Sequence, residues 1–210
     1  MTTTFPDISI NTDRLVLRAL EEADAPALAE MMNDEMVAAW TAVPQPYTED
    51  AARGWITEYA PPNAPPLGPR PRRHRVPHPA PRRHRPAQQH ELAGPLHRDV
   101  VHRRPWARGE GYASEAALAT AQWLFGDQKF ERLELRTAAD NTASQQVAQK
   151  IGCISEGVLR NACIARTRTE DGTWAELRTD FIVWGLLPED LDGVADQLAE
   201  AGYSSYTDWS

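Results

Sequence analysis

Proline density between residues 61 and 105 constrains the fold more than any other feature of this 210-residue sequence. These 45 residues hold 12 of the 17 prolines, ten arginines, all six histidines and two acidic residues. Proline fixes φ and has no amide hydrogen to donate, so this density disfavours helices and the inner strands of a sheet. The segment is typical of an extended, solvated linker.

Charge separates the same segment from the rest of the chain. Residues 61–105 carry a net charge of +8 and the other 165 residues carry −16, with −8 overall. Because 41% of the residues are hydrophobic, the chain can bury a core, and we expect one domain over 1–190 with a tail at 191–210. No stretch approaches the roughly 18 consecutive apolar residues of a membrane span. Two cysteines are too few for a disulfide framework, so we expect a cytoplasmic protein with no membrane partner.

Alternating and helical hydrophobic patterns predict regular elements on both sides of this segment. The expected strands are 14–18, 132–136, 157–166 and 174–186, and the expected helices are 25–32, 48–59, 114–125 and 141–151. Thr48 is the expected N-cap of the second helix, and Asp140 or Asn141 that of the fourth, which ends at Gly152. The Glu-Asp-Gly sequence at 170–172 predicts a hairpin turn.

A glycine-spaced loop precedes the helix expected at 114–125. It consists of Arg108, Gly109, Glu110, Gly111, Tyr112 and Ala113. Small residues leave the backbone accessible, the first amides of a helix have no intrahelical partner, and the helix dipole adds about half a positive charge. The loop is a candidate phosphate site with Arg108 close by. A tight turn that serves only packing fits the pattern equally well.

The order of motifs after the loop carries further information: a helix, a strand, a capped helix, a glycine turn and two strands. This order resembles that of the GNAT superfamily of acetyl-CoA-dependent N-acetyltransferases. Segments 12–18, 105–113 and 156–161 are similar to the branch that contains the ribosomal-protein N-terminal acetyltransferases. The resemblance covers about residues 8–60 and 105–190. It implies an α/β fold with a central mixed sheet flanked by helices.

The resemblance also implies roles for the matching residues. Backbone amides from Gly109 to Ala113 would bind the pyrophosphate of coenzyme A, with Arg108 beside it. Asn141 would hydrogen-bond the pantetheine arm or a water, and Ser144 is the candidate donor that protonates the leaving thiolate. The expected co-substrate is acetyl-CoA, and the expected acceptor is a primary amine, either a small molecule or a protein N-terminus. A simple helix cap at Asn141 and an exposed hydroxyl at Ser144 stay open.

Other candidate groups are less specific. Glu134 and Glu156 are possible general bases, but acids in such positions more often belong to a solvated surface. Cys153 and Cys163 are expected to be small core residues, because a catalytic thiol needs a partner base and every histidine lies in 61–105.

Residues 61–105 stand where the family places three central strands, the last of which offers main-chain groups to the acetyl carbonyl and the pantetheine arm. The pattern of those strands is missing here. One hypothesis is a pair of compensating frame shifts in GC-rich DNA. A catalytically impaired relative is a second possibility for this chain, and a homodimer stays open.

Two further explanations of the segment are weaker. An arginine-rich arm would neutralise nucleic-acid phosphates, but the segment has no aromatic residue for base stacking and the other residues carry −16. A metal site at His74, His78, His84 and His90 lacks accompanying acids or cysteines. We therefore expect neither a nucleic-acid partner nor a metal.

Overall fold

The structure is a computed structural model and describes residues 9–41, 43–59, 108–191 and 193–194. Its elements, in chain order, are β1 (Ile10–Asn11), β2 (Val16–Leu17), the 3-10 helix η1 (Glu22–Asp24), α1 (Ala25–Met32), α2 (Glu35–Trp40), α3 (Glu49–Tyr59), α4 (Tyr112–Gly126), β3 (Leu133–Ala138), α5 (Thr142–Lys150), β4 (Ile154–Arg168) and β5 (Trp174–Leu186). The expectations for 61–105, including the linker, the nucleic-acid arm and the histidine site, lie outside the described residues.

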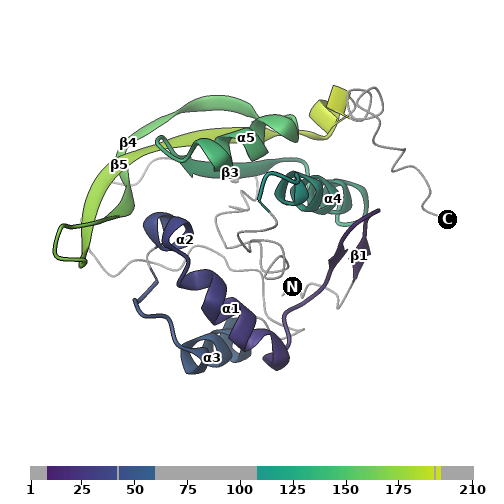
Figure 1. Cartoon of the computed structure of the whole chain (residues 1–210). Coiled ribbons are helices and arrows are strands. Elements are labelled where there is room, and N and C mark those ends of the chain that lie inside the picture. The colour runs from purple at the N-terminus through teal and green to yellow at the C-terminus, as the bar shows by residue number, and fades with distance from the viewer. Residues whose placement is uncertain (1–8, 42, 60–107, 192, 195–210) are drawn as a thin grey trace, which may run out of the picture.

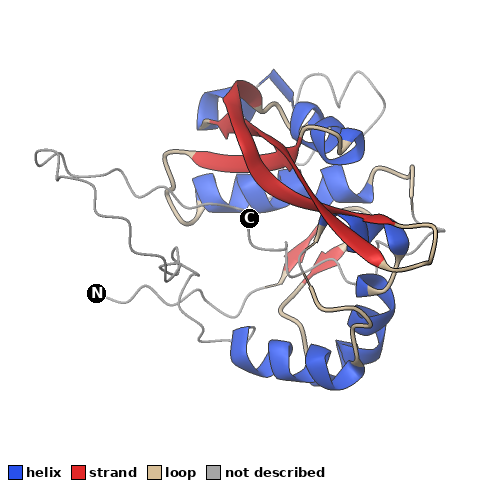
Figure 2. Cartoon of the chain, turned by 90° about the vertical axis from the view of Figure 1, so that its left-hand side faces the viewer, coloured by secondary structure: helices blue, strands red, loops and turns tan. Residues whose placement is uncertain are grey.

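Strands in the described ranges form two sheets that share no strand. β1 and β2 pair antiparallel, with Ile10 opposite Leu17. The second sheet has the order β3-β5-β4 and is antiparallel throughout. β4 and β5 form a long, curved hairpin that extends over α2 (Figures 1 and 2). This combination of helices and sheets confirms the α/β fold class that the sequence predicted.

Helix α4 is buried on two sides. Its residues Ala117 and Ala121 pack in the sheet core, which we define as Ala117, Leu118, Ala121, Leu124, Leu133, Ala148, Ile151, Cys153, Trp184, Leu186 and Val194. Ala116 and Ala119 pack instead in the N-terminal core, which we define as Ile10, Leu15, Leu17, Ala116 and Ala119. Small side chains let both sets of neighbours approach the helix closely.

A third cluster joins the first helices. This helical core contains Leu20, Ala25, Leu28, Ala29, Met32, Tyr47, Ala52 and Ile56. Leu28 is 2% exposed, and burial of a leucine side chain stabilises a fold by about 1.5–3 kcal/mol. The helices predicted at 25–32 and 48–59 are confirmed as α1 and α3, and the Ala51 amide donates to Thr48 Oγ1 at 3.1 Å, as expected of an N-cap.

The remaining elements follow the predictions with shifted ends. Leu15 and Leu17 are buried and Val16 is 60% exposed, as the alternation predicted, although β2 covers only two residues. α2 and β1 were not predicted. Asp34 caps α2 by accepting hydrogen bonds from the Met36 and Val37 amides.

Gly152 follows α5 with a φ of +89°, as the predicted helix end requires. A Cβ there would lie 2.7 Å from Val194 Cγ2, so the glycine also allows close packing with the chain beyond β5. Leu191 and Val194 contact the sheet core, and most of the predicted tail at 191–210 lies outside the described residues. In the described part of the chain, no helix combines the length and the apolar character needed to cross a membrane.

Candidate functional site

The glycine-spaced loop forms the turn that leads into α4. Gly109 and Gly111 have φ values of +85° and +80°, in the left-handed region that other residues rarely adopt. Gly111 is the N-cap of α4, and its carbonyl oxygen accepts hydrogen bonds from the Ser114 and Glu115 amides, each at 3.0 Å. The helix therefore begins at Tyr112, two residues before the predicted start, and its first amides point toward the loop.

The described surroundings of the loop leave its glycines uncrowded. A Cβ at Gly109 would meet no atom of a described residue within 4 Å, and one at Gly111 would lie 3.8 Å from Arg14 Nη2. Among the described residues, backbone conformation rather than lack of space accounts for glycine at both positions. Amides at the positive end of a 15-residue helix are a donor set that suits a diphosphate group.

Arg108 begins this loop, but its side chain points to the start of α2. Its Nη2 atom lies 2.5 Å from Asp34 Oδ1, the oxygen that also caps α2. The guanidinium is therefore paired with a carboxylate in this structure. Its predicted place beside a phosphate stays a prediction.

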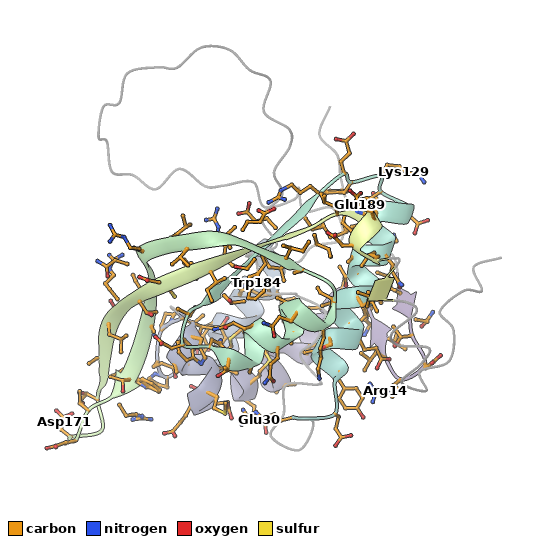
Figure 3. All side chains as sticks on the ribbon, turned by 90° about the horizontal axis from the view of Figure 1, so that it is seen from above. Arg14, Glu30, Lys129, Asp171, Trp184 and Glu189 are labelled. Atoms are coloured by element: carbon orange, nitrogen blue, oxygen red, sulfur yellow. The ribbon has the colours of Figure 1, made fainter. Side chains whose placement is uncertain are left out.

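Three residues that received no role from the sequence join the loop to the segment between β1 and β2: Thr12, Arg14 and Glu115, the last of which lies in the first turn of α4. Glu115, 7% exposed, accepts hydrogen bonds from Thr12 Oγ1 at 2.5 Å and from Arg14 Nε at 2.7 Å. Arg14 Nη1 also donates to the Glu110 carbonyl oxygen at 3.0 Å, and the guanidinium carbon lies 4.6 Å from the centroid of the Tyr112 ring. Arg14 is labelled in Figure 3. The sequence offered one signal for this arrangement, the acidic residue Glu115 in the first turn of the expected helix. A carboxylate that is buried requires a cation as its partner.

Asn141 and Ser144 lie at the start of α5. Asn141 Oδ1 accepts a hydrogen bond from the Ser144 amide at 3.1 Å, so Asn141 rather than Asp140 provides the predicted cap. Asn141 Nδ2 and the Ser144 hydroxyl make no hydrogen bond to any other described residue. The predicted contacts of both groups with a ligand stay predictions. α5 packs with α4 in the sheet core.

The two candidate general bases are held in ion pairs. Glu156 Oε1 lies 2.7 Å from Arg132 Nη1, and this guanidinium lowers the pKa of the Glu156 carboxyl. Glu134 Oε1 lies 2.9 Å from Arg136 Nη2. A carboxylate stabilised in its charged form is a weaker base, so Glu156 does not fit the general-base role while its pair is intact.

The two cysteines are buried, as predicted. Burial raises the pKa of Cys153 to about 12 and also raises the pKa of Cys163 above its usual value. A thiolate nucleophile is thus disfavoured near neutral pH at both positions. Across the described ranges, no three His, Cys, Asp or Glu side chains are grouped as metal ligands.

Comparison with known proteins identifies the family of this chain. The acetyltransferase (GNAT) domain model matches residues 14–70 and 81–154, more than half of the chain. The chain belongs to the GNAT acetyltransferase family. The match includes the loop, α4 and α5, and it omits residues 71–80 inside the proline-rich segment. Among curated proteins, none matches the chain at a significant level.

Solved GNAT structures have the same fold. A GNAT-family acetyltransferase from Bacillus anthracis is 21% identical, with a TM-score of 0.57 over 87% of this chain and 99% of that chain. A ribosomal-protein-S5-alanine acetyltransferase from Vibrio fischeri is 15% identical, with a TM-score of 0.57 over 88% and 99%. Mycobacterium smegmatis RimJ, in complex with CoA-disulfide, is 17% identical, with a TM-score of 0.59 over 90% and 89%. The family resemblance in the sequence is confirmed.

Proposed function

We propose that this GNAT chain transfers the acetyl group of acetyl-CoA to a primary amine. The observation that carries the proposal is the left-handed turn at Gly109 and Gly111, which opens directly into the positive end of α4. Family membership supports acetyl transfer, and the CoA-disulfide complex of the M. smegmatis neighbour supports coenzyme A as the ligand.

The residues of the loop and of α5 would divide the work of binding and proton transfer. The amides from Gly109 to Ala113 bind the diphosphate, and Asn141 Nδ2 donates to the pantetheine arm. Ser144 Oγ gives its proton to the departing sulfur and takes up the proton that the attacking nitrogen loses as the amide forms, and its hydroxyl is not engaged elsewhere among the described residues. Acetyl-CoA supplies the acetyl group as a thioester. Most of the acceleration comes from holding a neutral amine next to it.

A protein N-terminus is the acceptor that we favour over a small amine. The support is the V. fischeri neighbour, whose substrate is a ribosomal-protein alanine. The reaction would then take place in the cytoplasm, where the buried thiols also stay reduced. Peptides that begin with alanine or serine, compared with a polyamine at equal concentration, distinguish the two acceptor classes.

Calorimetry of the purified protein with coenzyme A tests the cofactor site. We expect binding by the wild-type chain and none by Gly111→Trp, because the added ring blocks the approach of a diphosphate at a position with a φ of +80°. Gly126→Trp is the matched control at the other end of α4, where a Cβ would meet no described atom within 4 Å. Wild-type protein that does not bind coenzyme A, or Gly111→Trp with unchanged affinity, would contradict the proposal.

A further inference from the structure

We propose that Arg14 is a positioning residue for the diphosphate site: it holds the Glu110 carbonyl and thereby turns the Gly111 amide hydrogen toward the ligand. This inference rests on the proposed function, because it concerns the same loop. The inference adds to the site a supporting residue that does not touch the ligand. This residue, Arg14, lies in the turn between β1 and β2, more than 90 residues before Glu110 in the sequence.

The argument starts from the geometry of one peptide unit. The Glu110 carbonyl and the Gly111 amide belong to the same planar, trans peptide, so C=O and N–H point in opposite directions. Arg14 Nη1 donates to the Glu110 oxygen at 3.0 Å. The Gly111 amide hydrogen must therefore point away from Arg14, to the opposite side of the loop.

The guanidinium can fix this peptide because it is itself fixed. Its Nε and Nη2 atoms lie 2.7 Å and 2.5 Å from Glu115 Oε2, and its flat face lies over the Tyr112 ring. Glu115 is in turn held by Thr12 Oγ1 and by the Arg14 backbone amide, at 2.5 Å and 3.3 Å. Each nitrogen of the guanidinium thus has an acceptor on the first turn of α4 or on the loop.

Charge explains why Arg14 positions the loop and does not replace it as the anion ligand. Glu115 neutralises the guanidinium on the far side of the loop, and its carboxylate is almost fully buried. An approaching diphosphate therefore meets amide hydrogens and the dipole of α4. Lysine could pair with Glu115, but its single nitrogen cannot also reach the Glu110 carbonyl in the same geometry.

The test compares Arg14→Lys with Arg18→Lys. Arg18 forms a similar pair, with its Nη1 and Nη2 atoms 2.8 Å and 3.0 Å from Asp24, but it does not contact the loop. We expect Arg14→Lys to weaken coenzyme A binding about tenfold, as for the loss of one charged hydrogen bond. KM for acetyl-CoA should rise by the same factor with kcat unchanged, and the Gly111 amide should exchange faster in hydrogen-exchange measurements. Arg18→Lys should leave all three unchanged.

Each outcome separates this inference from the function on which it rests. Wild-type protein that binds no coenzyme A contradicts the proposed function and the inference together. Wild-type binding with unchanged affinity in Arg14→Lys, or with an equal loss in Arg18→Lys, contradicts the inference alone. If Arg14→Lys does not fold, Glu115→Gln keeps the shape of the side chain but removes the charge that holds the guanidinium. We expect the same rise in Kd from it, and an unchanged Kd would contradict the inference.

Discussion

Ser144 is a residue whose hydroxyl can be removed without disturbing the local fold. The cap of α5 uses the Ser144 backbone amide and the Asn141 side chain, so it does not need the serine hydroxyl. The hydroxyl also makes no hydrogen bond to another described residue. A loss of activity on its removal would therefore report on chemistry rather than on helix stability.

Ser144→Ala is expected to lower kcat by about 10²-fold, the lower end of what a positioned proton donor contributes, with little change in KM for acetyl-CoA. Steady-state kinetics measure both values. Thr142→Ala, in the same helical turn and exposed, is the control and should keep full activity. An unchanged kcat in Ser144→Ala would exclude the hydroxyl as the donor.

Local signals predicted part of the site at the level of single residues. Asn141 was one of two caps that the sequence allowed, and the structure selects it. The pairing of Arg14 with Glu115 was not predictable, because no periodicity relates two residues that are 101 positions apart. Side chains that meet only through tertiary packing leave no local pattern.

Elements were predicted well where their ends carry a strong backbone signal. Gly152 and the turn at 170–172 both appear as expected, and Gly152 and Gly172 have positive φ values, which glycine adopts readily at the end of a helix or in a turn. α2 was missed because six residues are too few to show a helical period, even though Asp34 is a good N-cap. The start of α4 was misplaced by two residues, because Gly111 forms the cap through its conformation and not through a side chain.

The β4–β5 hairpin closes on a carboxylate that is stabilised in its charged form. Asp171 Oδ1 accepts hydrogen bonds from Thr169 Oγ1, from the Thr173 amide at 3.1 Å and from Thr173 Oγ1 at 2.8 Å. These bonds, first that of Thr169, lower the pKa of Asp171 from 3.8 to about 2. The carboxylate therefore supports the turn only while it is ionised.

Acid titration checks this feature of the hairpin. A carboxyl whose pKa is lower in the folded state contributes stability that is present above pH 3.8 and is lost as the pH falls through about 2. We expect NMR titration to give Asp171 a pKa of about 2 in the wild type, and Thr169→Val to move it toward 3.8. Thr167→Val, in β4 next to the turn, should leave it in place. A Thr169→Val protein with an unshifted Asp171 would contradict this account of the turn.

At the scale of the whole molecule, polar contacts link the first helices to the rest. Arg108 pairs with Asp34, Arg168 Nε lies 3.5 Å from Glu35, and Arg166 Nη1 donates to the Val43 carbonyl. The helical core shares no residue with the sheet core or the N-terminal core. Arg108 is thus both part of this link and the first residue of the proposed diphosphate loop.

If Arg108 also contacts the diphosphate, its pairing with Asp34 and ligand binding compete. Asp34→Asn keeps the cap of α2 but removes the competing charge, and we expect it to tighten coenzyme A binding by about fivefold, the lower end of the usual range of coupling between sites. Arg108→Gln should weaken binding, and the control Glu35→Gln should not change it. Calorimetry measures all three. Unchanged or weaker binding in Asp34→Asn would place Arg108 away from the phosphates.

The family and the mixed α/β architecture were predictable from the order of motifs after residue 105. The packing of the β1–β2 sheet was not predictable from the sequence. β1 and β2 together cover four residues, and a pattern of that length does not show which neighbours they pack against. Within the described ranges, β3 pairs with β5 alone. The compensating frame shifts in 61–105 stay a hypothesis, and resequencing of the gene is its direct test.

The packing of α4 has a consequence for ligand association. Ala116 and Ala119 contact one core while Ala117 and Ala121 contact another, so rotation of the helix about its axis would expose both sets of methyl groups at once. We therefore expect the direction of its first turn to be the same before and after a ligand binds. If coenzyme A binds at that end as proposed, we expect little reorganisation of the backbone, so that most of the favourable enthalpy of the new hydrogen bonds is retained in the binding free energy.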